Sequence, residues 1–148
     1  MQQKVYVDTS VLILLFKINQ LNLLLLLYRN VYITEEIRVE YRDAIPNWIL
    51  VESSSTETSE NFDLDKGEAS LINNVIKYKN SLLIIDDAKA RRVAKKLNLN
   101  FIGTIGIIIK AKQLGYINKI KPLLEKMNLT NFRLAPDIQA KALLLAGE

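Results

Sequence analysis

The sequence predicts an α/β fold, in which helices cover both faces of a mostly parallel central sheet. One observation supports this fold, and a second concerns the number of domains. Short apolar runs alternate along the chain with segments of helical spacing, and this alternation is typical of a three-layer α/β/α sandwich. The chain has 148 residues and no obvious break, so we expect a single domain over residues 1–148.

The strands are expected where an apolar run is short and bounded by polar residues. They are "KVYV" at 4–7, "NVYI" at 30–33, "WILV" at 48–51, "LLII" at 82–85 and "NFIG" at 100–103. The polar, Ser/Thr-rich stretch 52–63 is expected to be a mobile surface loop.

The helices are expected between the strands, where apolar residues recur every three or four positions. The helical segments are 35–43, 65–79, 88–97, 104–115, 117–127 and 137–147. Thr9 or Ser10 is expected to cap a first helix near Val11, and Thr34 to cap the helix at 35–43. Gly115 is expected to end the helix that precedes it.

The Leu-rich segment 11–28 looks membrane-like at first. Polar residues at 17, 19, 20 and 22 interrupt it, and no run reaches the length that spans a bilayer. We therefore expect two buried helices joined by a polar turn. No signal peptide is visible, so a cytoplasmic protein is expected.

Histidine and cysteine are both absent from the sequence. This excludes disulfides, thiolate or imidazole metal sites, a cysteine nucleophile and every Ser-His triad. Any catalysis would use carboxylates, lysine, tyrosine, hydroxyl groups or a bound hard cation.

The net charge of +4 is unevenly distributed. Residues 88–126 hold ten Lys or Arg and one acid, whereas residues 35–68 hold ten acids and three bases. The basic part could attract a polyanion, and the acidic part collects carboxylates. Solvated helix faces are the simpler explanation of the basic part taken alone.

Acidic residues follow two of the predicted strands. Asp8 follows the first strand, and Asp86 and Asp87 follow the fourth. The carboxyl ends of parallel strands meet at one edge of the sheet, where ligands of such sheets bind. Glu68, at the start of a predicted helix, and either Glu36 or Glu40, which share one face of an earlier helix, are candidates for the same edge.

Carboxylates gathered at one edge repel one another and stabilise a fold poorly. They suit Mg²⁺ or Mn²⁺, which prefer oxygen ligands. Simple structural roles are also open. Asp65 and Asp87 could cap helices, and Glu35 and Glu36 could be N-terminal charges favoured by the helix dipole.

Six short motifs occur in order along the chain: "VYVDTS", "IRVEY", "DKGEASLI", "LLIIDDAKAR", "GTIGIIIKAKQLG" and "LLLAGE". Each is weak alone, but their order and spacing resemble a PIN-domain protein of the small VapC-like toxin type over nearly the full length. The spacing of Glu68 and Asp86 matches that of the family's third and fourth acids. The "GE", "IDD" and "GTxG" elements are similar to a less characterised prokaryotic PIN subgroup.

The resemblance implies particular site residues. The acidic cluster would be Asp8, Glu40, Glu68 and Asp86, with Asp8, Asp86, Glu68 and Asp87 as metal ligands. Glu40 is preferred to Glu36, its neighbour one turn away, because an Ile-x-x-Glu step matches the subgroup. Hydroxyls that could orient ligands or water belong to Thr9, Ser10 and Thr104, for which helix capping is the alternative. The chain departs from the usual toxins in having Glu at 68 and Ile85 where many carry a hydroxyl residue.

The resemblance also implies an activity and partners. The chain would be a metal-dependent ribonuclease, in which Mg²⁺ or Mn²⁺ activates water to attack an RNA phosphodiester. The basic residues that would hold the RNA backbone are Lys89, Arg91, Arg92, Lys95 and Lys96, together with those of 110–121. Proteins of this kind are usually the toxins of type II toxin-antitoxin pairs, homodimers neutralised by a small antitoxin.

Three other interpretations remain. The first is a catalytically weak PIN-like module that binds RNA or protein. The second is a response-regulator-like or phosphatase-like protein, disfavoured because "NFIGT" offers no lysine at a late strand end. The third is that the acids converge without any function.

Overall fold

The computed structural model describes residues 3–55 and 63–148, and these residues form one five-stranded sheet. The strand order is β3-β2-β1-β4-β5, and every neighbouring pair is parallel. The strands are β1 (Lys4–Val7), β2 (Val31–Thr34), β3 (Ile49–Glu52), β4 (Ser81–Ile84) and β5 (Phe101–Ile102). The predicted α/β fold with a mostly parallel sheet is confirmed.

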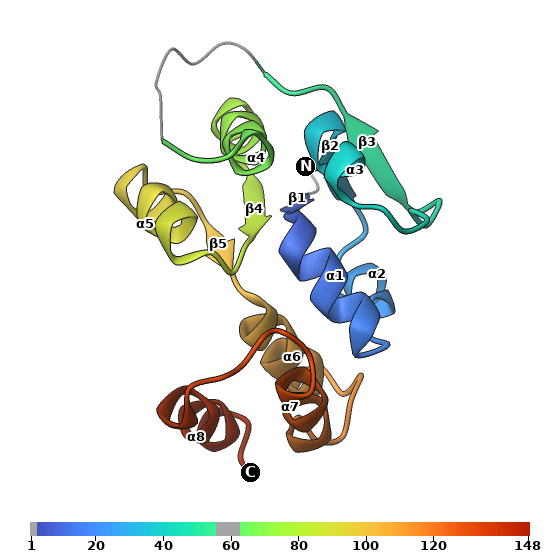
Figure 1. The fold of residues 1–148 in the computed structure, drawn as a ribbon, viewed down its shortest axis with the longest axis vertical. Coiled ribbons are helices and arrows are strands. Elements are labelled where there is room, and N and C mark those ends of the chain that lie inside the picture. Colours follow the sequence, from blue (N-terminus) through green and yellow to red (C-terminus); the bar gives the residue numbers. More distant parts are fainter. Residues whose placement is uncertain (1–2, 56–62) are drawn as a thin grey trace.

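Helices connect the strands and cover both faces of the sheet (Figure 1). The chain proceeds from β1 outward to β3 and then returns to β4, and parallel crossovers are right-handed. The helices that connect β1 to β2 and those that connect β3 to β5 therefore lie on opposite faces, and the helix that follows β5 packs against the two helices between β1 and β2. The helices are α1 (Thr9–Lys17), α2 (Asn22–Leu27), α3 (Glu35–Glu40), α4 (Lys66–Lys77), α5 (Ala88–Lys96), α6 (Thr104–Gln113), α7 (Lys121–Asn128) and α8 (Pro136–Leu145).

The strand register brings the candidate acids to one edge. Val7 pairs with Ile84, so Asp8 and Asp86 both follow neighbouring strand ends. β2 leads directly into α3, whose first turn is capped by the Thr34 hydroxyl, which accepts from the Ile37 N–H at 3.3 Å. Because α3 contacts both α1 and α4, it carries its acids over the same edge.

The Leu-rich segment forms two helices, α1 and α2, as predicted. Leu12, Leu15 and Leu24 are fully buried in the core, whereas Leu25 and Leu26 are exposed. In the part of the chain that the structure describes, no helix has the length and apolar character needed to cross a membrane.

Several predicted boundaries were wrong. α1 begins at Thr9 with Asp8 in the N-cap position, and the Thr9 and Ser10 hydroxyls donate to the carboxylates of Glu40 and Asp8. α3 ends at Glu40, three residues earlier than expected. Of the predicted loop 52–63, residues 56–62 lie outside the described residues, and Glu52 belongs to β3.

The C-terminal residue ties α7 to the end of the chain. The Glu148 carboxylate accepts from the backbone N–H of Ile120 at 2.6 Å and pairs with Lys112 at 2.9 Å. Ile120 occupies the N-cap position of α7, and its side chain cannot accept a hydrogen bond. The Glu148 carboxylate supplies an acceptor at this helix start instead. Gly115, with φ +85°, follows α6 and ends it as predicted.

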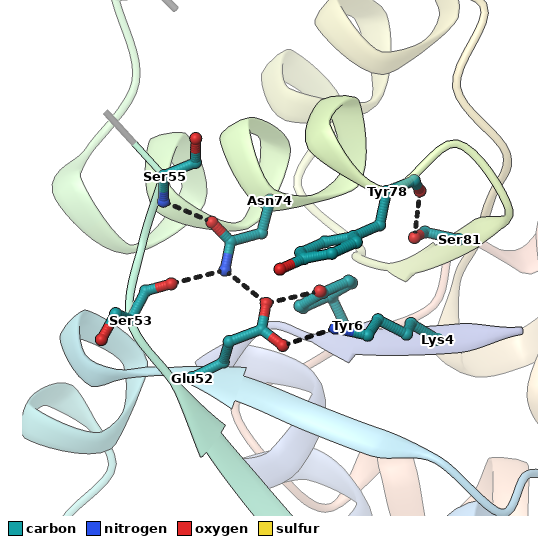
Figure 2. A network of polar contacts seen from close by, with 8 residues as sticks. All are labelled: Lys4, Tyr6, Glu52, Ser53, Ser55, Asn74, Tyr78 and Ser81. Carbon is teal, nitrogen blue, oxygen red and sulfur yellow. Dashed lines mark hydrogen bonds and ion pairs between the residues drawn. The ribbon is translucent and has the colours of Figure 1, made fainter. Parts of the chain in front are cut away.

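A polar cluster of Lys4, Tyr6, Glu52 and Asn74, here called the Glu52 cluster, joins β1, β3 and α4 (Figure 2). The Glu52 carboxylate accepts from the Tyr6 hydroxyl at 2.6 Å, from Lys4 Nζ at 2.9 Å and from Asn74 Nδ2 at 3.0 Å. Burial raises the pKa of the Tyr6 hydroxyl, which therefore remains a donor. The Lys4 ammonium also lies 3.6 Å from the centroid of the Tyr78 ring.

Candidate functional site

An acidic cleft of about 440 Å³ opens at the carboxyl edge of the sheet. Among the described residues that line it, six are acids and none is basic. The lining residues are Asp8, Thr9, Ser10, Ile13, Glu40, Asp65, Glu68, Asp86, Asp87 and Phe132. The structure thus brings together the four predicted catalytic acids, which come from four different segments of the chain.

Asp8 is the most buried acid of the cleft, with 5% of its surface exposed. Its backbone N–H donates to the Ile84 carbonyl at 3.1 Å, which fixes it to the end of β4. Burial, together with the smaller contributions from the charges of Asp65 and Glu40, raises the pKa of its carboxyl to about 6. The Ser10 hydroxyl, which donates to Oδ2 at 3.1 Å, opposes that rise.

Glu40 reaches the cleft from the last turn of α3. The Thr9 hydroxyl donates to its Oε2 at 2.7 Å and so orients the carboxylate. Gly67 in α4 leaves space for it, because an added Cβ would lie 2.9 Å from Glu40 Cδ and closer still to Oε1. The alternative acid, Glu36, lines a neighbouring depression with Glu35, Val39, Glu40 and Lys66.

Glu68 occupies the first turn of α4. Burial raises the pKa of its carboxyl to about 7, with further contributions from the charges of Asp65, Asp8 and Asp87. Asp65 caps the same helix, since its side chain accepts from the Glu68 N–H at 2.8 Å. The neighbouring acids therefore add to the rise in the pKa of Asp8 and of Glu68.

Asp86 is held by a single residue of the next βα unit. Thr104 donates to its two oxygens, from the backbone N–H at 2.8 Å and from the hydroxyl at 2.7 Å. Gly103 again leaves the necessary space, because a Cβ there would lie 2.7 Å from Asp86 Oδ1. The hydroxyl of Thr104 thus contacts a predicted ligand directly.

Asp87 combines the two roles that the sequence left open. Its Oδ2 accepts from the Ala90 N–H at 2.9 Å and caps α5, and the residue also lines the cleft. The cap uses one carboxylate oxygen, and the charge of Asp87 contributes to the raised pKa of Glu68.

The donor set of the cleft suits a hydrated hard cation. Among residues 3–55 and 63–148, no three carboxylates stand close enough together to hold a metal ion. Mg²⁺ does not need such a cage, because it keeps several waters and is usually held by one or two carboxylates together with substrate phosphates. Uncompensated acids with raised pKa values provide that kind of site.

The predicted RNA-binding residues lie on α5, and they differ in their surroundings. Lys89 pairs with Asp63 at 2.8 Å, and Arg91 lies over the ring of Phe101. The remaining three, Arg92, Lys95 and Lys96, are exposed.

Sequence reasoning missed the roles of Gly67 and Gly103. Each glycine stands immediately before a residue of the site, Glu68 or Thr104, and each makes room for a carboxylate from another segment. The only sequence signal was the pair of dipeptides "GE" and "GT", because close approach of a distant side chain is not visible in a linear pattern.

These features define an α/β protein with an acidic site at the carboxyl edge of a parallel sheet. A family model described as a PIN domain matches residues 4–148, so the chain belongs to the PIN-domain family. PIN domains are in general nucleases. Searches of curated proteins and of solved structures return no match.

Proposed function

We propose that this protein is a metal-dependent ribonuclease that uses the acidic cleft to hydrolyse RNA phosphodiesters. The observation that supports it best is the gathering of Asp8, Glu40, Glu68 and Asp86 around one cleft, which no basic side chain lines in the described part of the chain. A divalent cation bound among these carboxylates would offset their negative charge.

Asp8 and Asp86 would be the principal ligands of Mg²⁺ or Mn²⁺, with Glu68 and the free oxygen of Asp87 beside them. When bound, such an ion lowers the pKa of water and neutralises charge on the phosphate. Glu40, oriented by Thr9, and Glu68 would position the attacking water. Thr104 and Ser10 would keep the carboxylates of Asp86 and Asp8 in place.

The basic residues of α5 would hold the RNA backbone next to the cleft. Contacts from arginine and lysine to phosphate give affinity without reading the sequence. Selectivity would then come from RNA shape or from unpaired bases. The candidate residues are Lys89, Arg91, Arg92, Lys95 and Lys96, with further support from Lys110, Lys112, Lys119 and Lys121.

The biological role that we propose rests on the resemblance of the sequence motifs to those of VapC-like toxins. The chain would be the toxin of a type II toxin-antitoxin pair, a cytoplasmic homodimer neutralised by a small antitoxin. Exposed apolar residues on α1 and α8, such as Phe16 and Leu144, would be available for these contacts. The competing proposal is a PIN-like module that binds RNA or protein but cuts weakly.

The experiment uses labelled single-stranded and structured RNAs, with Mg²⁺ or Mn²⁺ and with EDTA. We expect cleavage that needs metal, disappears in Asp8→Asn and persists in Asp137→Asn, a matched change in the exposed first turn of α8. Equal cleavage by Asp8→Asn would show that another enzyme is responsible. Absence of both cleavage and calorimetric Mn²⁺ uptake would favour the binding module.

A further inference from the structure

Arg91 differs from the other basic residues of α5 in its surroundings. Its guanidinium carbon lies 5.2 Å from the centroid of the Phe101 ring, so the planar group rests on an aromatic side chain of β5. The residue is partly buried, whereas Arg92, Lys95 and Lys96 are exposed. This packing restricts the orientations that the long side chain can adopt.

The guanidinium also lies beside a carboxylate of the cleft. A Cβ added to Gly103 would lie 2.9 Å from Arg91 Nη1 and 2.7 Å from Asp86 Oδ1. Both groups thus border the same small space, which a side chain at position 103 would fill. Arg91 itself does not line the cleft, so it stands at the margin of the cleft on the β5 side.

Arg91 nevertheless makes no ion pair with its neighbour. Within the described residues four ion pairs form, and their cations are Lys4, Arg38, Lys89 and Lys112. Asp86 takes its two hydrogen bonds from Thr104 instead. A restrained guanidinium whose donors are not taken by a carboxylate is suited to bind an anion from outside the chain.

We propose that Arg91 is the residue that binds a backbone phosphate of the nucleic acid beside Asp86, and so fixes the strand relative to the cleft. The inference rests on the proposed nuclease function and selects one contact from the five basic residues of α5. The planar fork, set by Phe101, would engage two phosphate oxygens, which a point charge does not do. Gly103, which has no Cβ, lets Arg91 and Asp86 both pack closely against its backbone.

The test measures binding apart from cleavage. Fluorescein-labelled oligouridylate is titrated with the full chain in EDTA, and anisotropy gives the Kd at several salt concentrations. The variants are Arg91→Gln, Arg91→Lys and, as the matched control, Arg29→Gln. Arg29 is exposed and precedes β2, at the opposite edge of the sheet.

We expect Arg91→Gln to weaken binding about tenfold at low salt, as loss of a charge-assisted hydrogen-bond pair does. The slope of log K against log salt should fall by about 0.7, the value for one phosphate contact on a single strand. Arg91→Lys should keep the slope but remain weaker than wild type, and Arg29→Gln should match wild type. With Mg²⁺, Arg91→Gln should raise KM more than it lowers kcat.

The outcomes separate this inference from the proposed function. Suppose that the wild type cleaves RNA, but Arg91→Gln has the same Kd and salt slope as Arg29→Gln. This result would overturn the phosphate contact of Arg91 alone, and Arg91 would then only pack on Phe101. No cleavage by the wild type, with the Arg91 effect on binding present, would keep the phosphate contact and overturn the nuclease. If circular dichroism shows Arg91→Gln to be unfolded, Arg91→Lys decides: affinity equal to wild type would contradict the requirement for a fork.

Discussion

Glu52 and Asp8 are both largely buried carboxylates at the carboxyl ends of strands, but their surroundings are opposite. Glu52 accepts hydrogen bonds from three side chains, one of which is the ammonium of Lys4. Asp8 receives one side-chain hydrogen bond, from Ser10, and the charges that act on it are those of other acids. The chain therefore neutralises one buried carboxylate fully and leaves the other exposed to repulsion.

The difference distinguishes an acid that stabilises the fold from one that serves a ligand. Neutralising a buried carboxylate requires a cation and complementary donors, and the Glu52 cluster shows that this chain can supply both. In the cleft, Thr9, Ser10 and Thr104 orient the carboxylates without cancelling their charge. The missing positive charge is then expected from outside the chain, as a divalent cation.

The largest expected effect is that of Asp8→Asn on activity. Because metal ligation supplies several kcal/mol of transition-state stabilisation, kcat/KM for RNA cleavage should fall at least about 100-fold. The same change removes a desolvated charge, so the free energy of unfolding at pH 8, measured in urea without metal, should stay equal or increase. Retained cleavage combined with lost stability would place Asp8 with the structural acids.

Glu52→Ala should have the reverse effect. It leaves the Tyr6 hydroxyl without its acceptor and removes one of the two acceptors of Asn74 Nδ2. We expect the free energy of unfolding to fall by about 2–3 kcal/mol. Cleavage per folded molecule should change little. Urea unfolding measures the loss of stability, and Glu125→Ala, at an exposed position, is the control. A loss of activity in conditions where the variant is fully folded would show that the Glu52 cluster also positions the cleft.

The strands, and the acids that follow β1 and β4 at the carboxyl edge of the sheet, are predictable from the sequence because they follow from local patterns. Short apolar runs locate the strands, and parallel strands bring Asp8 and Asp86 to one edge whatever the details of packing. The Thr34 cap is likewise a local property. These features depend on a few neighbouring residues and on a general rule of topology.

The Glu52 cluster was not predictable in the same way. It joins Tyr6 to a residue 46 positions away, and the contact exists only because β3 pairs with β2 and β2 with β1 in a particular register. The capping of α1 was mispredicted for a related reason. The hydroxyls of Thr9 and Ser10 fit a capping pattern locally, but Asp8 takes the N-cap position, and the fold brings the Glu40 carboxylate within a hydrogen bond of Thr9.

The pH dependence of stability sharpens the comparison. Burial raises the pKa of Asp8 to about 6 and that of Glu68 to about 7, above the values of about 4 expected in the unfolded chain. Between these limits the folded protein holds protons that the unfolded chain has released. The free energy of unfolding should therefore fall by about 1–2 kcal/mol as the pH rises from about 4 to 7, with the smaller share from the more exposed Glu68.

Thermal unfolding across this pH range, without metal, measures the effect. Asp8→Asn should flatten the profile, whereas Glu52→Gln should lower it without changing its slope in this window. Millimolar Mg²⁺ at pH 8 should raise Tm in the wild type, because an ion that binds only the folded state stabilises it. A profile that rises between pH 4 and 7 in Asp8→Asn and wild type alike would mean that other groups control the stability.

The smallest expected effect is that of Gly67→Ala, which tests whether Glu40 belongs to the working cleft. The added Cβ would meet the Glu40 carboxylate and, at 2.8 Å, Ile37 Cδ1, so Glu40 should be displaced from Thr9. We expect kcat/KM to fall about fivefold, since small displacements of a positioning group have effects of this order or larger. In a double-mutant cycle, Gly67→Ala should cost almost nothing further once Glu40→Ala is present, because the two changes act on one carboxylate. Additive losses would mean that the alanine disturbs the cleft by another route, for instance through Ile37 and the packing of α3 on α4, and would remove the reason to prefer Glu40 over Glu36.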